Sequence, residues 1–272
     1  MLKSLGHIEG RDILIEARWA EDRSEKLPAL AQELVRLTPV VILTTGPGIA
    51  ACKKATSVIP IVFATGTTPV ERGFVESLRR PGGNITGVLL PDLTEKTMEV
   101  VREALPRAQR LAILLHEVDP FFGPTLDAVV SAANRFKFEP VIVRVKRVEE
   151  LASAFDEIVR SKPDALFLTG QAFTLSHHPY LVERSLAARL PLFSPREEAT
   201  EAGGFLSYGS SRIENFRRAA TLVDKILRGA RPGDLPVEQP ERFQLIVNLR
   251  TAKAIGVTVP QSTLLRANKV IE

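Results

Sequence analysis

The stretch LVRLTPVVILTTGPGIAACKKA, residues 34–55, indicates the fold of this chain. Val40–Thr45 has the composition of a buried strand. The turn formers Gly46-Pro47-Gly48 then interrupt it, and a helical pattern resumes directly afterwards. A strand that ends in a glycine-rich loop and leads into a helix is the repeating unit of an α/β sheet.

Part of this stretch occurs twice. LVRLTPVVILTTG (34–46) and IVRSKPDALFLTG (158–170) align without gaps, with identical Val, Arg, Pro, Thr and Gly residues. The segments before and after each copy also correspond in order. The sequence therefore predicts two α/β halves built on one plan.

Short apolar runs alternate with amphipathic helical patterns along the whole chain. Because these runs are apolar on both faces, they are typical of parallel strands covered by helices. We expect a doubly wound α/β fold with strands at 12–19, 40–45, 60–65, 85–90, 111–116, 141–145, 165–170, 190–194, 205–209 and 243–248.

The second half begins with an element that the first half lacks. A strand at 111–116 and a helix over 121–136 precede the strand at 141–145, but nothing equivalent precedes 12–19. The missing strand would normally lie between 12–19 and 40–45. We expect either a chain shortened at its N-terminus or a homodimer in which strand exchange supplies the missing strand.

Three extended connections follow complete α/β units, which indicates two lobes joined by a three-strand hinge. The predicted first lobe comprises residues 1–84 and 208–238, and the second comprises 85–207 and 239–272.

Open α/β sheets bind ligands beyond the carboxyl ends of their strands. There, Gly46 and Gly48 allow close backbone approach, and the helix that follows favours an anion such as a carboxylate. Alternatively, these residues only form turns and caps. The candidate ligand-binding residues are Thr44, Thr45, Gly46, Gly48, Thr65, Gly66, Thr67, Thr68, His116, Glu117, Phe121, Phe122, Gln171, Ala172, Arg196 and Tyr208.

Other site chemistries fit poorly. GPGIAA matches a loose dinucleotide-binding pattern, but no acidic residue ends the next strand to hold a ribose. Adjacent His177 and His178 would not share a helix face to bind one metal. His116 with Glu117 and Asp119 could serve as an acid/base group or as metal ligands, or simply form a polar loop. Phe121 and Phe122 either pack in the core or contact an apolar ligand. We expect no cofactor and no metal.

Composition excludes further classes. The net charge of +4 is spread among acidic residues, which argues against nucleic-acid binding. The single cysteine excludes an intrachain disulfide. No apolar run reaches the roughly 18 residues of a membrane span, and the first residues lack the apolar core of a signal peptide.

Three blocks resemble the ABC transporter substrate-binding protein family, whose members include tryptophan/tyrosine-type binding proteins. They are TPVERGFVESLRRPGGNITGV, AGGFLSYGSS and QPERFQLIVNLRTAKAIGVTVPQSTLLRANKVIE. The resemblance implies a type I periplasmic-binding fold, a small-molecule ligand such as an amino acid or related carboxylate, and no catalysis. It also implies a membrane permease and an ATPase as partners, and a location outside the cytoplasmic membrane.

Carried over by position, the family's contacts match the loops 45–48 and 66–69 in the first lobe. In the second lobe they match 116–122, Gln171-Ala172 and the residues around Arg196, with Tyr208 at the hinge. The chain departs at ATGTTPV, where relatives tend to carry an acidic residue before Pro-Val. A ligand-sensing regulatory module of the same fold, or an enzyme using His116, remain the alternatives.

Overall fold

The computed structural model describes residues 1–21 and 23–272, which divide into two compact units. Unit 1 comprises Met1–Pro91 and Arg212–Glu241, and unit 2 comprises Asp92–Ser211 and Arg242–Glu272, so the chain passes between them three times. The predicted boundaries at 84/85 and 207/208 are therefore wrong by several residues. Residues 85–91 belong to unit 1 because the strand that they contain pairs with its sheet, and 208–211 belong to unit 2 for the same reason.

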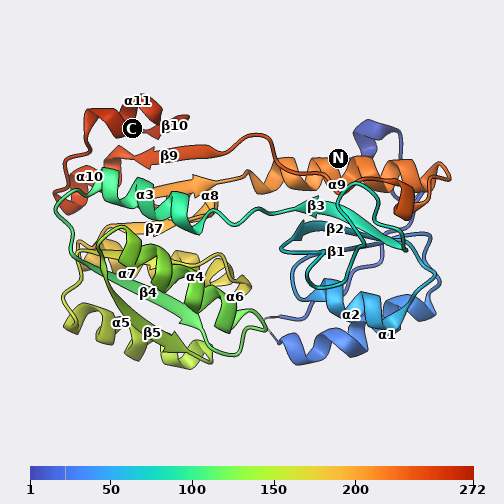
Figure 1. Cartoon of the computed structure of the whole chain (residues 1–272), viewed down its shortest axis with the longest axis horizontal. Helices are drawn as coiled ribbons and strands as arrows, with labels where there is room; N and C mark the ends of the chain where they lie inside the picture. The colour runs from blue at the N-terminus through green and yellow to red at the C-terminus, as the bar shows by residue number, and fades with distance from the viewer. Residues whose placement is uncertain (22) are drawn as a thin grey trace. The chain divides into compact units, whose positions relative to one another are not determined.

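Unit 1 is built on a parallel sheet of three strands in the order β1-β2-β3 (Figure 1). The strands are β1 (Ile42–Thr44), β2 (Ile61–Gly66) and β3 (Ile85–Leu89). Alternate residues of β2 face opposite sides. Phe63 packs towards α1 (Leu27–Arg36) and α2 (Gly48–Ala55), whereas Val62 packs towards α9 (Arg212–Leu227). This two-sided burial explains why the strands are apolar throughout.

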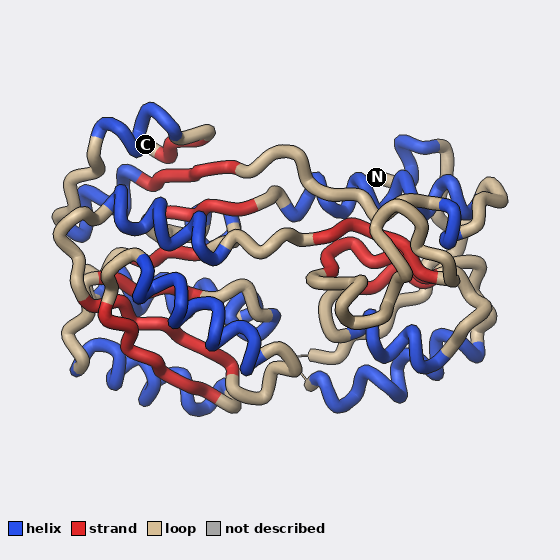
Figure 2. The backbone as a smooth tube through the Cα atoms, viewed as in Figure 1, coloured by secondary structure: helices blue, strands red, loops and turns tan. Residues whose placement is uncertain are grey.

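Unit 2 holds a sheet of seven strands in the order β10-β9-β8-β7-β6-β4-β5, in which only the β8–β9 pair is antiparallel. Figure 2 shows the strands in red and the helices in blue. Its strands are β4 (Arg110–His116), β5 (Glu139–Val145), β6 (Ala165–Leu168), β7 (Leu192–Ser194), β8 (Leu206–Gly209), β9 (Gln244–Asn248) and β10 (Lys269–Ile271). The sequence analysis missed β10, a three-residue edge strand whose first two residues are exposed.

Helices cover both faces of this sheet. Ile113 of β4 lies in the apolar cluster with α3 (Thr94–Ala104) and α4 (Phe122–Arg135). Leu114 lies in the cluster on the other face, which α5 (Leu151–Arg160) and α7 (His178–Ala187) cover. The remaining helices of unit 2 are α6 (Ala172–Ser176), α8 (Glu197–Glu201), α10 (Leu249–Ile255) and α11 (Gln261–Arg266). Short 3-10 turns are found in both units: η1 (Leu2–Leu5), η2 (Ser24–Lys26) and η4 (Pro232–Asp234) in unit 1, and η3 (Val148–Glu150) in unit 2.

The predicted internal repeat is visible in local structure. Helices α1 and α5 both have ten residues, and the aligned residues Thr38 and Lys162 after them both adopt a left-handed backbone, with φ of 47° and 50°. The aligned strands then bond in the same way. The Ile42 N–H donates to the Pro60 carbonyl at 2.8 Å, and the Leu166 N–H donates to the Pro191 carbonyl at 2.9 Å.

The predicted strand at 12–19 is wrong. Of these residues, Ile13 makes one isolated bridge with Glu9, and no strand is assigned to the segment. Leu14, Ile15 and Trp19 are exposed. The corresponding strand of unit 2, β5, pairs with β4. Because the described part of unit 1 has no counterpart of β4, residues 12–19 lack a strand to pair with.

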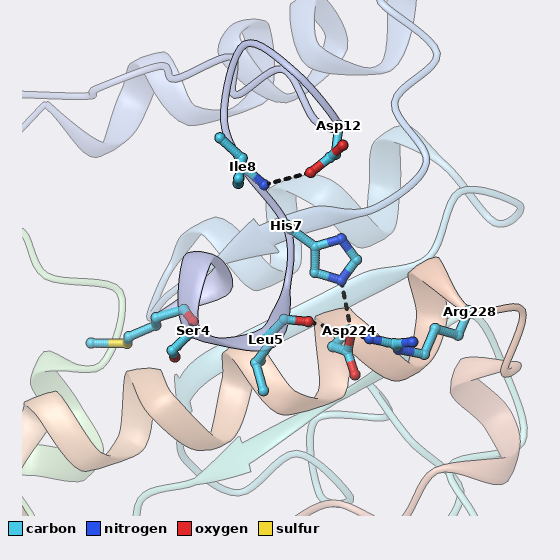
Figure 3. Close-up of polar contacts among 8 residues, drawn as sticks. Ser4, Leu5, His7, Ile8, Asp12, Asp224 and Arg228 are labelled. Atoms are coloured by element: carbon cyan, nitrogen blue, oxygen red, sulfur yellow. Dashed lines mark hydrogen bonds and ion pairs between the residues drawn. The ribbon is translucent and has the colours of Figure 1, made fainter.

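The first residues are instead tied to α9. The His7 Nε2 atom lies 2.7 Å from a carboxylate oxygen of Asp224, and the Arg228 guanidinium bonds both Asp224, at 2.8 Å, and the Leu5 carbonyl, at 3.2 Å (Figure 3). Leu2 also packs against the apolar side chains of α9. Within the described ranges, no helix combines the length and hydropathy that crossing a membrane requires.

Candidate functional site

In each unit, the predicted site residues follow strands that run in parallel, so their loops emerge at one edge of the sheet.

In unit 1, the loops after β1 and β2 are bonded to each other. The Gly46 N–H donates to the Thr65 carbonyl at 3.1 Å, and Gly46 has a left-handed backbone with φ of 49°, which glycine adopts without strain. Thr45 is exposed, as are Thr67 and Thr68 after β2. This hydrogen bond brings the loop after β1 next to the end of β2.

Thr44 has a supporting position in this arrangement. Its hydroxyl bonds the Cys52 thiol and occupies the space that a side chain at Gly48 would need. Burial raises the pKa of the Cys52 thiol, and the hydrogen bond with Thr44 opposes that rise. The absence of a side chain at Gly48 therefore allows α2 to begin close against β1. The Thr44 hydroxyl links the end of β1 to Cys52 of α2.

The loop after β2 carries a cation that the sequence analysis missed. Thr68 has a left-handed backbone with φ of 46°, and its hydroxyl accepts a hydrogen bond from the Arg72 Nε atom at 3.0 Å. The Thr68 carbonyl also accepts the Arg72 N–H at 3.1 Å. Arg72 is half-buried and lies within the TPVERGFV block. A basic residue four positions after a turn threonine is the signal that could have identified it.

In unit 2, Gln171 joins the ends of β4 and β6. Its side-chain oxygen accepts the His116 N–H at 2.8 Å and the Thr169 hydroxyl at 3.0 Å, while its side-chain nitrogen donates to the His116 carbonyl at 3.2 Å. Thr174 continues the network by donating to the Thr169 carbonyl at 2.6 Å. The buried Gln171 side chain therefore sets the spacing of two strand ends.

The His116 ring is buried within unit 2. It stacks on the Phe173 ring with centroids 4.3 Å apart and an angle of 6° between the planes, and its Nε2 atom lies 3.2 Å from the Lys146 carbonyl. Phe173 also contacts the edge of His177. These contacts favour a positioning role for His116 over proton transfer.

The loop after β4 is organised by Asp119. Its carboxylate accepts the Phe121 N–H at 2.8 Å, and its carbonyl accepts the Phe122 N–H at 2.9 Å, at the start of α4. Glu117 pairs loosely with Lys146 at 3.8 Å. The described residues contain no group of His, Cys, Asp and Glu side chains arranged to hold a metal ion.

The two phenylalanines of this loop are both half-buried. Phe122 packs against the core, and the Arg144 guanidinium lies 5.3 Å from its ring centre. The sequence analysis predicted that these phenylalanines either pack in the core or contact an apolar ligand. Phe122 takes the first of these positions.

A second cation lies at the ends of β6 and β7. The Arg196 backbone N–H donates to the Ser194 hydroxyl at 3.1 Å, and a Cβ atom at Gly170 would lie 3.4 Å from the Arg196 Nε atom. The Arg196 guanidinium therefore lies beside the backbone of Gly170. Ala172, which begins α6 beside this point, is exposed. Tyr208 is half-buried on β8, with its ring 6.3 Å from that of Phe243.

The arrangement suits a small polar ligand with a negative charge. Each unit offers loop N–H groups, hydroxyls and one arginine at the carboxyl ends of its strands, and guanidinium groups bind carboxylates through paired hydrogen bonds. The direct ligand contacts of the sixteen candidate residues stay a prediction.

Known proteins are similar to this chain in sequence and in fold. Residues 1–271 match the model of a family described as ABC transporter substrate binding protein. A tyrosine-binding protein of Clostridioides difficile is 25% identical over 257 residues, which are 94% of this chain and 74% of that protein.

Two crystal structures are similar along the whole chain. A conserved domain protein from Vibrio cholerae has a TM-score of 0.91 at 25% identity, covering 99% of this chain and 91% of that one. An ABC domain from Streptococcus pneumonia in complex with L-Trp has a TM-score of 0.89 at 22% identity, with the same coverage.

Proposed function

The chain belongs to the ABC transporter substrate binding protein family, and from this premise we propose that it is the solute receptor of an ABC-type uptake system for an amino acid or a related carboxylate. Loops at the strand ends contribute to binding. The receptor performs no chemistry on its ligand, and it delivers the ligand to a membrane permease driven by an ATPase. It acts outside the cytoplasmic membrane, in the periplasm or its equivalent.

The observation that carries the ligand class is the position of Arg196 against Gly170, beside the Gln171–His116 network. A guanidinium at the end of buried parallel strands favours a carboxylate, because few water molecules compete for it there. The names of the relatives add aromatic amino acids as the first candidates.

A thermal-shift and calorimetry screen tests this proposal. Tyrosine, tryptophan, aliphatic amino acids and benzoate form the panel, with tyramine and tryptamine as matched compounds that lack the carboxylate. A ligand at about 100 times its Kd stabilises the folded state by roughly 2.7 kcal/mol. We expect stabilisation by at least one carboxylate and none by its amine counterpart. Equal stabilisation by both would contradict the role of the arginine.

Strand exchange with a second copy is a separate proposal. It concerns the edge of β1 that faces away from β2 and none of these loops.

A further inference from the structure

Unit 2 carries a groove between helices α5 and α7, which lie on the same face of its sheet. The groove has a volume of about 690 Å³, within the range of roughly 300–1,000 Å³ that is usual for small-molecule sites. Its apolar walls are formed by Phe155 and Val159 of α5, and by Ala187 and Ala188 at the end of α7. The small side chains of the two alanines leave this space open.

The internal repeat shows that the space is particular to unit 2. α5 corresponds to α1, and α7 corresponds to α2 because each precedes the next strand of its sheet. In unit 1 the backbones of α1 and α2 run close together, and the hollow between them and β1 measures only about 80 Å³. Val35 of α1 packs in the apolar cluster there, whereas the aligned Val159 is 45% exposed. The valine that unit 1 covers is therefore uncovered in unit 2.

Two arginines give the groove a positive charge. Within the described ranges Arg160 has no carboxylate partner, and its Nε atom donates to the Asp156 carbonyl at 3.3 Å. Arg184 pairs with the Asp156 carboxylate on the other helix at 3.2 Å, and its guanidinium lies 5.5 Å from the centre of the Phe155 ring. Among the residues that line the groove, one carboxylate thus faces two guanidinium groups.

The charged end of the groove is separate from the loops that we assign to solute binding. Arg160 ends α5 and Ala187 ends α7, shortly before the first residues of β6 and β7. Since these two strands are parallel, this end of the groove lies at their amino ends. Gln171 and Arg196 instead follow the carboxyl ends of the same strands.

The shape of the groove favours a chain-like ligand. From Ser153 to Arg160 it follows α5 over two turns, which corresponds to roughly 10 Å along the helix. Apolar atoms placed along this length would cover Val159 and remove its exposed surface from water.

We propose that the groove between α5 and α7 binds an amphiphilic anion, a molecule with an apolar chain and one carboxylate. The chain lies against Phe155 and Val159. The carboxylate pairs with the Arg160 guanidinium, because guanidinium groups bind carboxylates through two parallel hydrogen bonds. A cationic head group would instead face two like charges. The site lies wholly within unit 2, and it does not rest on the function proposed above.

Decanoate is the probe, used below the concentration at which it forms micelles. Methyl NMR spectra of the full chain should show saturable shifts at Val159, Ala187 and Ala188. Acetate has the head group without the chain, and decyltrimethylammonium has the chain with the opposite charge, so both should leave these signals in place. Because the three signals report on the groove itself, decanoate bound near Arg196 is read separately, and failure of either proposal is distinguishable from failure of the other.

Two variants test the wall and the charge. Ala187→Phe fills the groove and should abolish the shift at Val159. Ala254→Phe, at an exposed position of α10, is its matched control and should bind decanoate like the wild type. Arg160→Gln should raise the Kd for decanoate at least fivefold, whereas Arg107→Gln, at another exposed arginine, should leave it unchanged.

Three results would overturn the proposal. They are the absence of a saturable shift at Val159, equal binding of decyltrimethylammonium, and decanoate binding that Ala187→Phe and Arg160→Gln leave unchanged. Shifts of the same methyl groups when the protein alone is concentrated would assign the groove to a second copy and would also contradict it. Circular dichroism shows whether Ala187→Phe is folded, and Arg160→Gln decides alone if it is not.

Discussion

The Gln171 side chain holds the backbone of His116 at both of its polar groups, accepting the N–H at 2.8 Å and donating to the carbonyl at 3.2 Å. The two residues are 55 positions apart and both are buried. This link fixes the end of β4 relative to the end of β6, and so shapes the loops that we assign to ligand binding.

Gln171→Leu should destabilise unit 2, because it leaves the buried His116 N–H without a partner and removes one of the two hydrogen bonds that the His116 carbonyl accepts, the other coming from the Asp119 N–H. A buried group without a partner costs about 1–3 kcal/mol, so a loss of roughly 1–3 kcal/mol is expected in urea unfolding monitored by circular dichroism. Gln261→Ala, at an exposed glutamine, is the control and should stay within about 0.5 kcal/mol of the wild type. A Gln171→Leu variant as stable as this control would refute the structural role.

Gly48→Ala tests the close packing at the start of α2. The added methyl group would meet the Thr44 hydroxyl, so a loss of about 1–3 kcal/mol is expected. Gly123→Ala in α4 is the matched change, because nothing lies within 4 Å of its new methyl group, and it should be neutral or stabilising by up to about 1 kcal/mol.

Adding Thr44→Ala to Gly48→Ala removes the obstructing hydroxyl and should restore part of the lost free energy. If the double variant is as unstable as the sum of the two single changes, the obstruction lies elsewhere.

Sequence patterns predict the parts of this protein that local composition and the repeat determine. The strand–loop–helix at residues 34–55 forms β1 and α2 as expected, and its copy at 158–170 forms the expected strand β6. The segment 12–19 carries the composition of a strand but does not form one, because strand formation depends on a neighbour that its composition does not reveal. Patterns that are local in sequence therefore predict elements better than they predict pairing.

The candidate site shows the same division. Strand ends locate the loops, so Thr45, Gly46 and Arg196 lie where the sequence predicts. The inward direction of the His116 and Gln171 side chains depends on partners more than 50 residues away, which no local pattern contains. Arg72 was missed although its spacing of four residues from Thr68 is visible in the sequence, because the sequence analysis did not connect that spacing with the left-handed turn that brings the two side chains together.

Acid should release the first residues from α9. The hydrogen bond from His7, and then the one from Arg228, hold the pKa of Asp224 below its usual value (Figure 3). A carboxyl group with a depressed pKa contributes its stabilisation fully above its unfolded pKa, about 3.9, and loses it as the pH falls through the lower folded value. The wild type should therefore lose more stability than Asp224→Asn as the pH falls through and below about 4.

The melting temperatures of wild type and Asp224→Asn, followed from neutral to acid pH, measure this difference. Hydrogen exchange of residues 1–10 should accelerate in the wild type over the same interval and should be fast at every pH in Asp224→Asn. Parallel curves for the two proteins would show that Asp224 does not anchor the segment.

Arg196→Ala should weaken binding of a carboxylate ligand at least tenfold, about 1.4 kcal/mol, because it removes the cation beside Gly170. Arg196→Lys keeps the charge but loses the paired geometry, so intermediate affinity is expected. Arg107→Ala, at an exposed arginine, is the control for net charge and should bind like the wild type. Calorimetry with the ligand from the screen gives the three affinities. Arg196 is not the carboxylate partner if Arg196→Ala binds the ligand as tightly as Arg107→Ala does. The same holds if Arg196→Ala loses as much affinity for a ligand analogue without a carboxylate.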